Sequence, residues 1–201
     1  MTKVIEADRS FKVWWHLTRP HTLTASFVPV FLGTTIALTI EGEMINFPLF
    51  LAMLVASMLI QAATNMFNEY YDYKLGLDNE HSVGIGGTIV RHGVAPSTIM
   101  AIALSFYGIA LLLGIYICAM SSWWIAAVGL VCMLIGYLYT GGPYSIAYSP
   151  FGELVSGTVM GMGIVLIAFF IQTKTITLEA VLLAVPSMIL VGAIMLSNNI
   201  R

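Results

Sequence analysis

The sequence predicts an all-α integral membrane protein that forms one helical bundle. Only 9% of its 201 residues are charged and 59% are hydrophobic, whereas roughly 25% of a soluble globular chain is charged. The mean hydropathy is +0.91. A soluble fold of 21.9 kDa would leave too much surface in water to hide that many apolar side chains. The net charge of −2 also excludes nucleic-acid binding through a broad basic face.

About six stretches have the composition of a membrane-spanning helix, which needs roughly 20 mostly apolar residues. Barrel strands would be about half as long and would alternate polar with apolar residues. Before the first stretch, the segment around Trp14 and Trp15 mixes basic and apolar residues, which predicts a helix lying in the membrane interface. The predicted spans, in chain order, are Leu23–Ile40, Phe47–Phe67, Thr98–Ala119, Trp123–Tyr139, Leu154–Ile171 and Leu178–Leu196.

Basic residues predict how this bundle is oriented in the cell membrane. With six spans, both termini and the loops after the second and fourth spans lie on one side. The opposite side carries only Lys174. Because cytoplasmic loops are rich in Lys and Arg, the N-terminus and the loop from Glu69 to Ser97 are predicted to be cytoplasmic. The bases on that side are Lys3, Arg9, Lys12, Arg19, Lys74, Arg91 and Arg201.

The long loop follows a helix that carries Asn65, Asn68 and Asp72. Spacings of three and four place these side chains on one helix face. Such oxygen ligands suit a hard cation, and Mg²⁺ typically binds one or two carboxylates while substrate phosphates complete its shell. The alternative is a helix end with solvated polar side chains, terminated by Gly76. Polar groups are costly at membrane depth, which favours a functional site.

Asn68, Asp72, Tyr73, Gly76 and Asp78 form the pattern Asn-x-x-x-Asp-Tyr-x-x-Gly-x-Asp. This pattern resembles the first aspartate motif of the UbiA superfamily of intramembrane prenyltransferases. Gly76 followed by Asp78 is similar to the MenA branch, which prenylates 1,4-dihydroxy-2-naphthoate in menaquinone synthesis. Further matches follow in order along the chain: Thr18-Arg19-Pro20, Gly86-Gly87-Thr88-Ile89-Val90-Arg91, Tyr139-Thr140-Gly141-Gly142-Pro143-Tyr144 and Ser197-Asn198-Asn199-Ile200-Arg201.

The resemblance implies a UbiA-like bundle of about nine spanning helices, of which this chain supplies about six, with a polar chamber at its cytoplasmic mouth. It implies a polyprenyl diphosphate and an aromatic acid as substrates. Mg²⁺ and basic groups would stabilise the leaving diphosphate. The aromatic ring would attack the allylic carbocation with loss of CO2, giving demethylmenaquinone, while the tail of the donor stays in contact with the bilayer.

Individual roles follow from the same resemblance. Asn68, Asp72 and Asp78 match the metal positions, and Asn68 and Asp72 are also expected to take part in catalysis. Arg91 is predicted to bind either the diphosphate or the carboxylate of the aromatic acid. It is also predicted to assist departure of the diphosphate. The remaining predicted substrate contacts are Asn65, Lys74, Tyr144, Asn198 and Asn199, and Tyr139 is predicted to be catalytic by steadying the cation with its ring.

Several of these residues have simpler interpretations. Lys74 could be a positive charge flanking a span, and Tyr139 and Tyr144 could belong to an aromatic belt. Glu69 points about a quarter-turn away from the polar face and is predicted to be a solvated charge. The four histidines lack metal-ligand spacing, and the two cysteines lie inside apolar runs as core-filling residues.

The second acidic motif of the MenA branch reads roughly Asn-x-x-Arg-Asp-x-x-x-Asp, and the sequence ends at Arg201, before both aspartates. We therefore expect residues 1–201 to be a single transmembrane prenyltransferase domain that is truncated at its C-terminus. Two alternatives remain at this stage: another UbiA-superfamily branch with a different aromatic acceptor, and a non-catalytic or transport-type bundle. Transport would place acids near mid-membrane rather than at one mouth.

Overall fold

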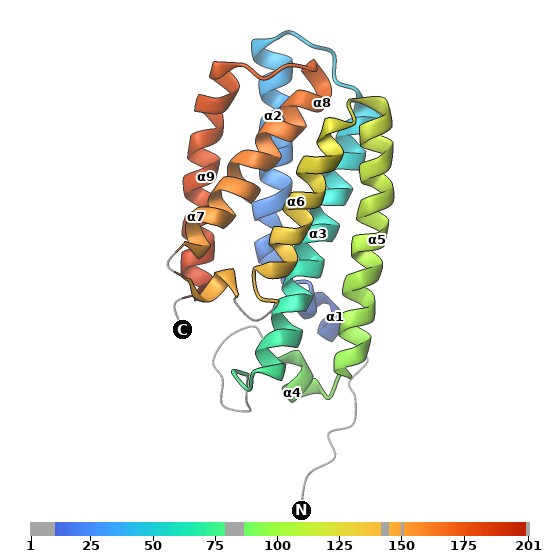
Figure 1. Cartoon of the computed structure of the whole chain (residues 1–201), viewed down its shortest axis with the longest axis vertical. Coiled ribbons are helices and arrows are strands. Elements are labelled where there is room, and N and C mark those ends of the chain that lie inside the picture. Colours follow the sequence, from blue (N-terminus) through green and yellow to red (C-terminus); the bar gives the residue numbers. More distant parts are fainter. Residues whose placement is uncertain (1–10, 79–86, 142–144, 150, 200–201) are drawn as a thin grey trace, which may run out of the picture.

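A computed structural model describes residues 11–78, 87–141, 145–149 and 151–199 of the chain. Every regular element in these ranges is a helix, and the helices run side by side along one axis (Figure 1). Five helical stretches are long and apolar enough to cross a membrane. They are α2 (Thr24–Ile40, preceded by the turn η1, Pro20–Leu23), α3 (Phe47–Lys74), α5 (Pro96–Met120), the continuous run from Gly152 to Thr173, and α9 (Leu178–Asn199).

The fourth predicted span forms a shorter helix than the others. α6 (Trp124–Leu138) has 15 residues, which corresponds to about 22 Å at 1.5 Å per residue, whereas the hydrocarbon core is about 30 Å thick. Its two ends nevertheless lie toward opposite ends of the bundle, so the up-and-down order of six passes is kept (Figure 1). The chain therefore has five full-length spans and one short apolar helix among its described residues.

Local sequence signals explain where α3 and α5 begin. The side chain of Asn46 caps α3 by accepting a hydrogen bond from the backbone N–H of Leu49, and a proline follows in the first turn. Pro96 opens α5, where its missing N–H costs nothing. These caps define the ends of the two helices that pack together most extensively in the structure.

The predicted interfacial helix is α1 (Phe11–Leu17). Its inner face buries Val13 and Leu17, while Phe11 and Trp15 stay exposed. It packs on α3 and on the short helix α4 (Thr88–His92). α1, α4, the C-terminal end of α3 and both described ends of the chain therefore lie at one end of the bundle (Figure 1).

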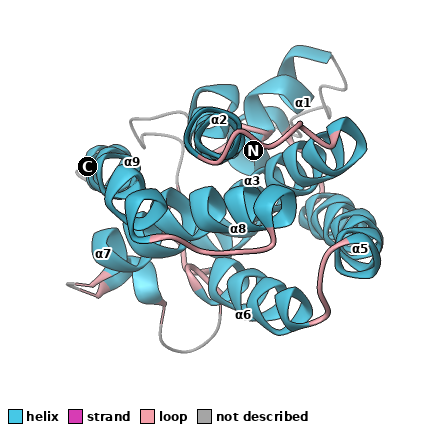
Figure 2. Ribbon diagram, turned by 90° about the horizontal axis from the view of Figure 1, so that it is seen from above, coloured by secondary structure: helices cyan, strands magenta, loops and turns pink. Residues whose placement is uncertain are grey.

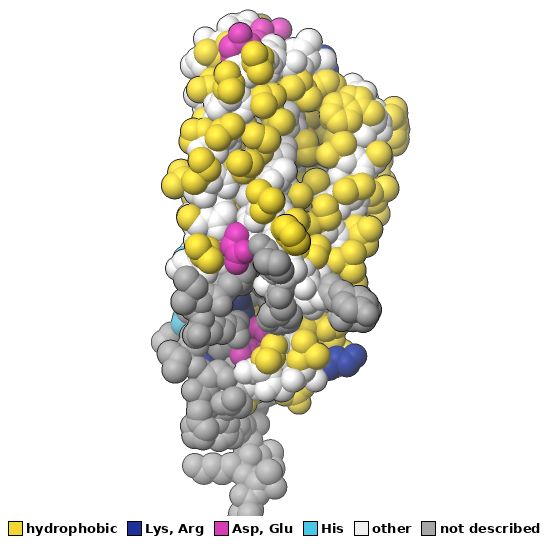
Figure 3. Space-filling model, turned by 60° about the vertical axis from the view of Figure 1, so that its left-hand side comes forward, with side chains coloured by type: hydrophobic (Ala, Val, Ile, Leu, Met, Phe, Trp, Pro, Cys, Tyr) yellow, Lys and Arg dark blue, Asp and Glu magenta, His cyan; other side chains and the backbone are white. Residues whose placement is uncertain are grey.

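α3 is the central helix of the bundle and packs against α2, α5, α6 and α8 (Figure 2). Its buried residues belong to two apolar clusters, one that includes Leu49 and Met53 and one that includes Met66 and Phe67, while a third cluster joins α2, α8 and α9. Large apolar side chains also cover much of the surface seen in Figure 3, where acidic side chains appear at the top and again in the lower half. Outward-facing apolar side chains are expected where lipid, and not water, is the solvent.

The stretch from Gly152 to Thr173 is continuous but changes its winding. It consists of α7 (Gly152–Ser156), a π-helical segment η3 (Gly157–Gly163) and α8 (Ile164–Thr173). Gly157 and Gly161 let η3 approach α9 closely, since a Cβ at either position would lie 2.6 Å from backbone atoms of Met188. Close approach through small residues is a usual way for membrane helices to associate.

Replacing Gly161 by alanine is expected to destabilise the fold by about 2 kcal/mol, because the new methyl group would overlap the α9 backbone. The free energy of unfolding in detergent micelles measures this loss. Gly163→Ala is the matched control, since its Cβ would have its nearest neighbour at 3.4 Å. Equal stabilities of the two variants would contradict the close packing of η3 on α9.

Candidate functional site

The polar face of α3 is formed as its spacing predicts. Asn65 and Asp72 are both only 4% exposed, and Asn68 between them is partly buried. All three lie in the last part of the helix, at the end of the bundle that holds α1 and α4. Three polar side chains, all at least partly buried, therefore lie together at one end of a largely apolar bundle.

Gly76 ends α3 and thereby positions Asp78. The N–H of Leu77 donates to the carbonyl of Asp72 at 2.9 Å, and the N–H of Gly76 donates to that of Tyr73 at 3.1 Å. With Gly76 in the left-handed conformation at φ 71°, these bonds form a Schellman motif. The chain turns back, the N–H of Asp78 also reaches the carbonyl of Asp72 at 3.4 Å, and Asp78 is 7% exposed.

The interpretation of Gly76 as a helix terminator is thus confirmed, and it does not exclude a site. The turn that ends the helix carries a second buried carboxylate back toward the first. The polar residues at this helix end are not solvated, because Asp72 and Asp78 are both buried.

Asn68 is held by the loop that follows α6. The hydroxyl of Thr140 donates to the amide oxygen Oδ1 of Asn68. Tyr139, the preceding residue, is 4% exposed, and its carbonyl accepts hydrogen bonds from Ala147 N–H at 2.8 Å and from the Ser145 hydroxyl at 2.6 Å. Two of the sequence motifs are therefore joined by a direct hydrogen bond.

Asn65 binds the N-terminal segment. Its amide nitrogen Nδ2 donates to the carbonyl of Thr18 at 2.9 Å and to the hydroxyl of Thr22 at 2.8 Å. Both protons of the amide group are used in this way. In the structure Asn65 therefore fixes the turn that contains Thr18-Arg19-Pro20 against α3.

The prediction that Glu69 is a solvated charge is wrong. Glu69 is 2% exposed, and its two carboxylate oxygens accept hydrogen bonds from the backbone N–H groups of Gly87 at 3.1 Å and Ile89 at 3.2 Å. Nη2 of Arg19 lies 3.5 Å from its Oε2. Glu69 does point a quarter-turn away from the polar face, but on that side it meets α4 and the N-terminal turn. The sequence alone does not show that these two segments pack against this side of α3.

Arg19 is the residue that sequence reasoning missed, because it was counted only as a flanking positive charge. Its side chain is 13% exposed and faces Glu69. Its backbone is left-handed at φ 48°, a conformation that non-glycine residues rarely adopt. The sequence feature that could have identified Arg19 is its position in Thr18-Arg19-Pro20, one of the segments that resemble the UbiA superfamily.

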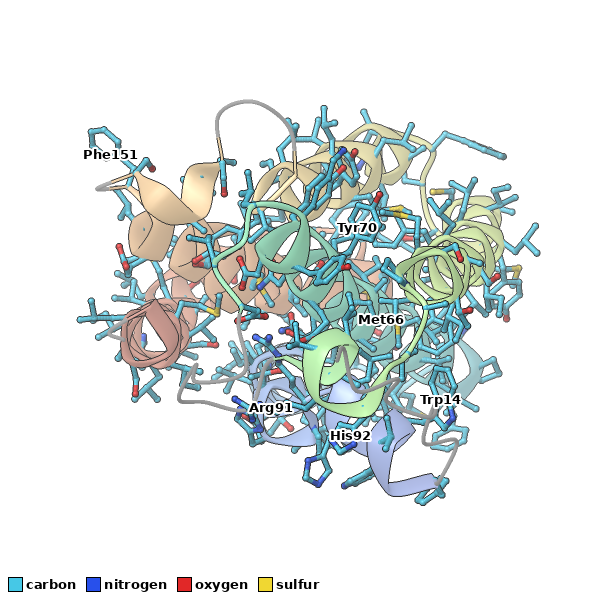
Figure 4. The ribbon with its side chains drawn as sticks, turned by 90° about the horizontal axis from the view of Figure 1, so that it is seen from below. Trp14, Met66, Tyr70, Arg91, His92 and Phe151 are labelled. Atoms are coloured by element: carbon cyan, nitrogen blue, oxygen red, sulfur yellow. The ribbon has the colours of Figure 1, made fainter. Side chains whose placement is uncertain are left out.

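The other predicted residues are distributed as follows. Arg91, in the last turn of α4, and Lys74, in the last turn of α3, are exposed at the same end of the bundle. Figure 4 shows Arg91 and His92 on α4 at the end that also carries Tyr70 of α3 and Trp14 of α1. Tyr144 lies outside the described residues, and Asn198 and Asn199 end α9 with side chains outside the description.

A cavity of about 290 Å³ begins at this polar end and continues between the helices. Asn65, Asn68 and Tyr139 line it at one end, together with Gln61 and Thr64. The rest of its wall is almost entirely apolar and comes from α3, α5, α6, the run from Gly152 to Thr173 and α9. The geometry suits a ligand with a polar head and a long apolar tail.

The described residues fit a Mg²⁺ ion that is held partly by its substrate. Asp72 and Asp78 supply two buried carboxylates, and the amide oxygen of Asn68 retains a second lone pair beside its bond to Thr140. No group of three or more His, Cys, Asp or Glu side chains in the described ranges could hold a metal by itself. Substrate phosphates would therefore have to complete the shell, as is usual for Mg²⁺.

Comparisons with known proteins identify relatives of this chain. The chain is 63% identical to the 1,4-dihydroxy-2-naphthoate octaprenyltransferase of Bacillus subtilis over 94% of its length, which covers 60% of that protein. It is 31% identical to the UbiA prenyltransferase domain-containing protein 1 of Xenopus tropicalis, covering 91% of this chain and 53% of that one. A 1,4-dihydroxy-2-naphthoate octaprenyltransferase of Mycobacterium tuberculosis is 29% identical to it, and the match covers 96% of this chain and 65% of that protein.

The chain thus spans less than two thirds of the length of these relatives. The family model described as the UbiA prenyltransferase family matches residues 26–201, which include the polar face of α3, the turn to Asp78 and the loop after α6. The resemblance seen in the sequence motifs is therefore confirmed over most of the chain. This multi-pass membrane protein belongs to the UbiA prenyltransferase family.

Proposed function

We propose that residues 1–201 form a single transmembrane prenyltransferase domain that transfers a polyprenyl group from its diphosphate to 1,4-dihydroxy-2-naphthoate with loss of CO2, giving the reduced (quinol) form of demethylmenaquinone. The observation that carries the proposal is the placement of Asn68 and Tyr139 at the polar end of an apolar cavity, beside Asp72 and Asp78. The acceptor is supported by the name of the Bacillus subtilis relative.

Mg²⁺ would be held by Asn68, Asp72 and Asp78, and it would neutralise charge on the diphosphate. Arg91 and Lys74 add positive charge at the same end of the bundle and favour departure of the diphosphate. When the allylic carbon–oxygen bond breaks, its electron pair leaves with the diphosphate. The apolar cavity keeps water from the carbocation, and the ring of Tyr139 stabilises its charge.

The aromatic ring then supplies the electron pair for the new carbon–carbon bond. The bond between the ring and the carboxylate breaks, its electron pair returns to the ring, and CO2 leaves. Arg91 is the residue that would bind the carboxylate of the aromatic acid before this step.

The active site is proposed to face the cytoplasm of the cell membrane. Arg19, Lys74 and Arg91 lie at the end of the bundle that carries the site, and Lys174 lies in the turn between α8 and α9 at the other end. This distribution agrees with the excess of Lys and Arg on cytoplasmic loops.

The test uses membranes from cells that lack their own dihydroxynaphthoate prenyltransferase. One preparation carries the chain, and another carries the chain fused at residue 201 to the part of the Bacillus subtilis relative that follows the aligned region. Both receive dihydroxynaphthoate, octaprenyl diphosphate and Mg²⁺, the quinol product is oxidised in air, and the resulting demethylmenaquinone is measured by mass spectrometry. We expect product from the fusion that disappears when the metal is chelated.

Two outcomes would contradict the proposal. Product with 4-hydroxybenzoate but not with dihydroxynaphthoate would assign the chain to another acceptor. The second outcome is that the fusion gives no product with either acceptor while the intact relative is active in parallel membranes. This result would show that the chain does not have the proposed transferase activity.

A further inference from the structure

Polar side chains of α3 continue along the cavity beyond Asn68. Asn65, Gln61 and Ser57 precede it at helical spacings that keep them on one side of α3, and all of them line the cavity. At a rise of about 1.5 Å per residue, Gln61 lies about 10 Å deeper than Asn68. It is 3% exposed. A polar side chain at this depth is costly unless it has partners, so its hydrogen bonds indicate its role.

The other polar side chains of α3 on this wall have partners within the protein. The hydroxyl of Ser57 donates to a backbone carbonyl of its own helix at 2.9 Å. The hydroxyl of Thr64 is hydrogen-bonded to a tyrosine of α5. Asn65 and Asn68 are held by the contacts described above. Among the described residues that line the cavity, Oε1 of Gln61 is the one buried side-chain oxygen or nitrogen without a hydrogen-bond partner.

Asn65 determines which half of the Gln61 amide is left without a partner. Both Nδ2 protons of Asn65 are donated to the N-terminal turn, so its Oδ1 is the acceptor that remains. Nε2 of Gln61 lies 3.5 Å from that oxygen. The reverse orientation of the Gln61 amide would set two carbonyl oxygens against each other. The carbonyl of Gln61 is therefore available to a ligand, and the terminal torsion of glutamine is soft enough for Oε1 to turn toward one.

A single carbonyl oxygen in an apolar cavity selects for a hydrogen-bond donor. A polyprenyl tail has no donor and would leave Oε1 buried and unsatisfied, which is costly. A carboxylate offers only acceptors and would oppose Oε1. The phenolic hydroxyls of the aromatic acid are suitable donors. One of them lies next to the carboxylate and donates to it, which leaves the 4-hydroxyl for Gln61.

We propose that Gln61 binds the 4-hydroxyl group of the aromatic acceptor and thereby sets the orientation of the acceptor in the cavity. The hydroxyl lies toward Gln61, and the carboxylate lies toward the polar end, where Arg91 and Lys74 add positive charge. The inference rests on the proposed function, because the hydroxyl belongs to the proposed acceptor. Gln61 is an acceptor-binding residue and takes no part in breaking the carbon–oxygen bond of the donor.

The first test measures binding and does not depend on turnover. The fusion described above is saturated with Mg²⁺ and a thiolodiphosphate analogue of geranyl diphosphate, which occupies the donor site without reacting. Dissociation constants are then measured without oxygen for 1,4-dihydroxy-2-naphthoate and for 1-hydroxy-2-naphthoate, which lacks only the 4-hydroxyl. We expect the dihydroxy acid to bind on the order of 10-fold more tightly, the size of one hydrogen bond.

Gln61→Met keeps the length of the side chain and removes its hydrogen-bonding atoms. We expect this variant to bind the two acids equally, because the 4-hydroxyl has lost its partner. Ser57→Ala is the matched control: Ser57 is one turn deeper on the same wall, and its hydroxyl already has a backbone partner. It should keep the preference for the dihydroxy acid. An unchanged preference in Gln61→Met, or an equal loss in Ser57→Ala, would overturn the proposal.

The second test separates acceptor binding from a structural role of Gln61 through Asn65. Initial rates of the fusion are measured with dihydroxynaphthoate and octaprenyl diphosphate. Gln61→Met is expected to raise the KM for the acceptor on the order of 10-fold and to leave the KM for the donor unchanged. If Gln61 only supported Asn65 and the N-terminal turn, its loss would not depend on the hydroxyl of the acceptor. A higher KM for the donor with an unchanged KM for the acceptor would overturn the proposal.

Failure of this proposal and failure of the proposed function give different results. A binding preference that depends on Gln61, in a fusion that forms no prenylated product, would contradict the proposed reaction and leave the hydroxyl site supported. Product formation with the same preference between the two acids in Gln61→Met and in the unsubstituted fusion would support the reaction and overturn the hydroxyl site.

Discussion

Asp72→Asn is expected to lower prenyl transfer by the fusion on the order of 100-fold or more, as loss of a group that stabilises transition-state charge does in other enzymes. Asp72 is a buried carboxylate on the polar face of α3, and Asp78 and Asn68 lie close to it in the chain. Asparagine keeps the shape of the side chain but removes the negative charge that a divalent cation needs. Initial rates at several Mg²⁺ concentrations measure the effect.

Glu43→Gln is the control for loss of one carboxylate, because Glu43 is exposed in the connection between α2 and α3, at the end of α3 opposite Asp72. It should retain the rate of the unsubstituted fusion. The amount of protein in the membrane and its thermal midpoint show whether the Asp72 variant is folded. Unchanged turnover in folded Asp72→Asn would remove this carboxylate from the mechanism.

Glu69→Leu is expected to destabilise the protein by about 3 kcal/mol, because it leaves the guanidinium of Arg19 buried without its partner carboxylate. The substitution also removes the acceptor of the Gly87 and Ile89 N–H groups at the start of α4. Since α4 carries Arg91, a looser α4 should also raise the KM for the donor. Unfolding in detergent micelles and donor kinetics of the fusion measure the two effects separately.

A double-mutant cycle with Arg19→Met separates the ion pair from the backbone hydrogen bonds. If the pair is coupled, the double variant should lose less stability than the sum of the two single losses. Glu179→Leu, at an exposed acid in the first turn of α9, is the control and should cost little. Additive losses at Arg19 and Glu69 would show that the ion pair contributes nothing.

Helix positions were predictable because lipid imposes a simple rule: each spanning segment must be apolar and must satisfy its own backbone hydrogen bonds. Five predicted spans are found as long apolar helices, and α1 lies where the tryptophans indicated. The remaining predicted span, Trp123–Tyr139, is found as the short helix α6, to within one residue at each end. The π-helical winding of η3 was not predictable. η3 winds differently where glycines meet the backbone of α9, and that contact is absent from the local sequence.

The sequence by itself determined the class of protein, the shared face of Asn65, Asn68 and Asp72, and the family, because these depend on composition and on spacings within one helix. Only the tertiary structure decided what each polar side chain touches. Glu69 differs from a solvated charge only through the approach of Gly87 and Arg19, which come from segments 18 and 50 residues away in the chain. Burial and partners are properties of the packed bundle, and helical spacing carries no information about them.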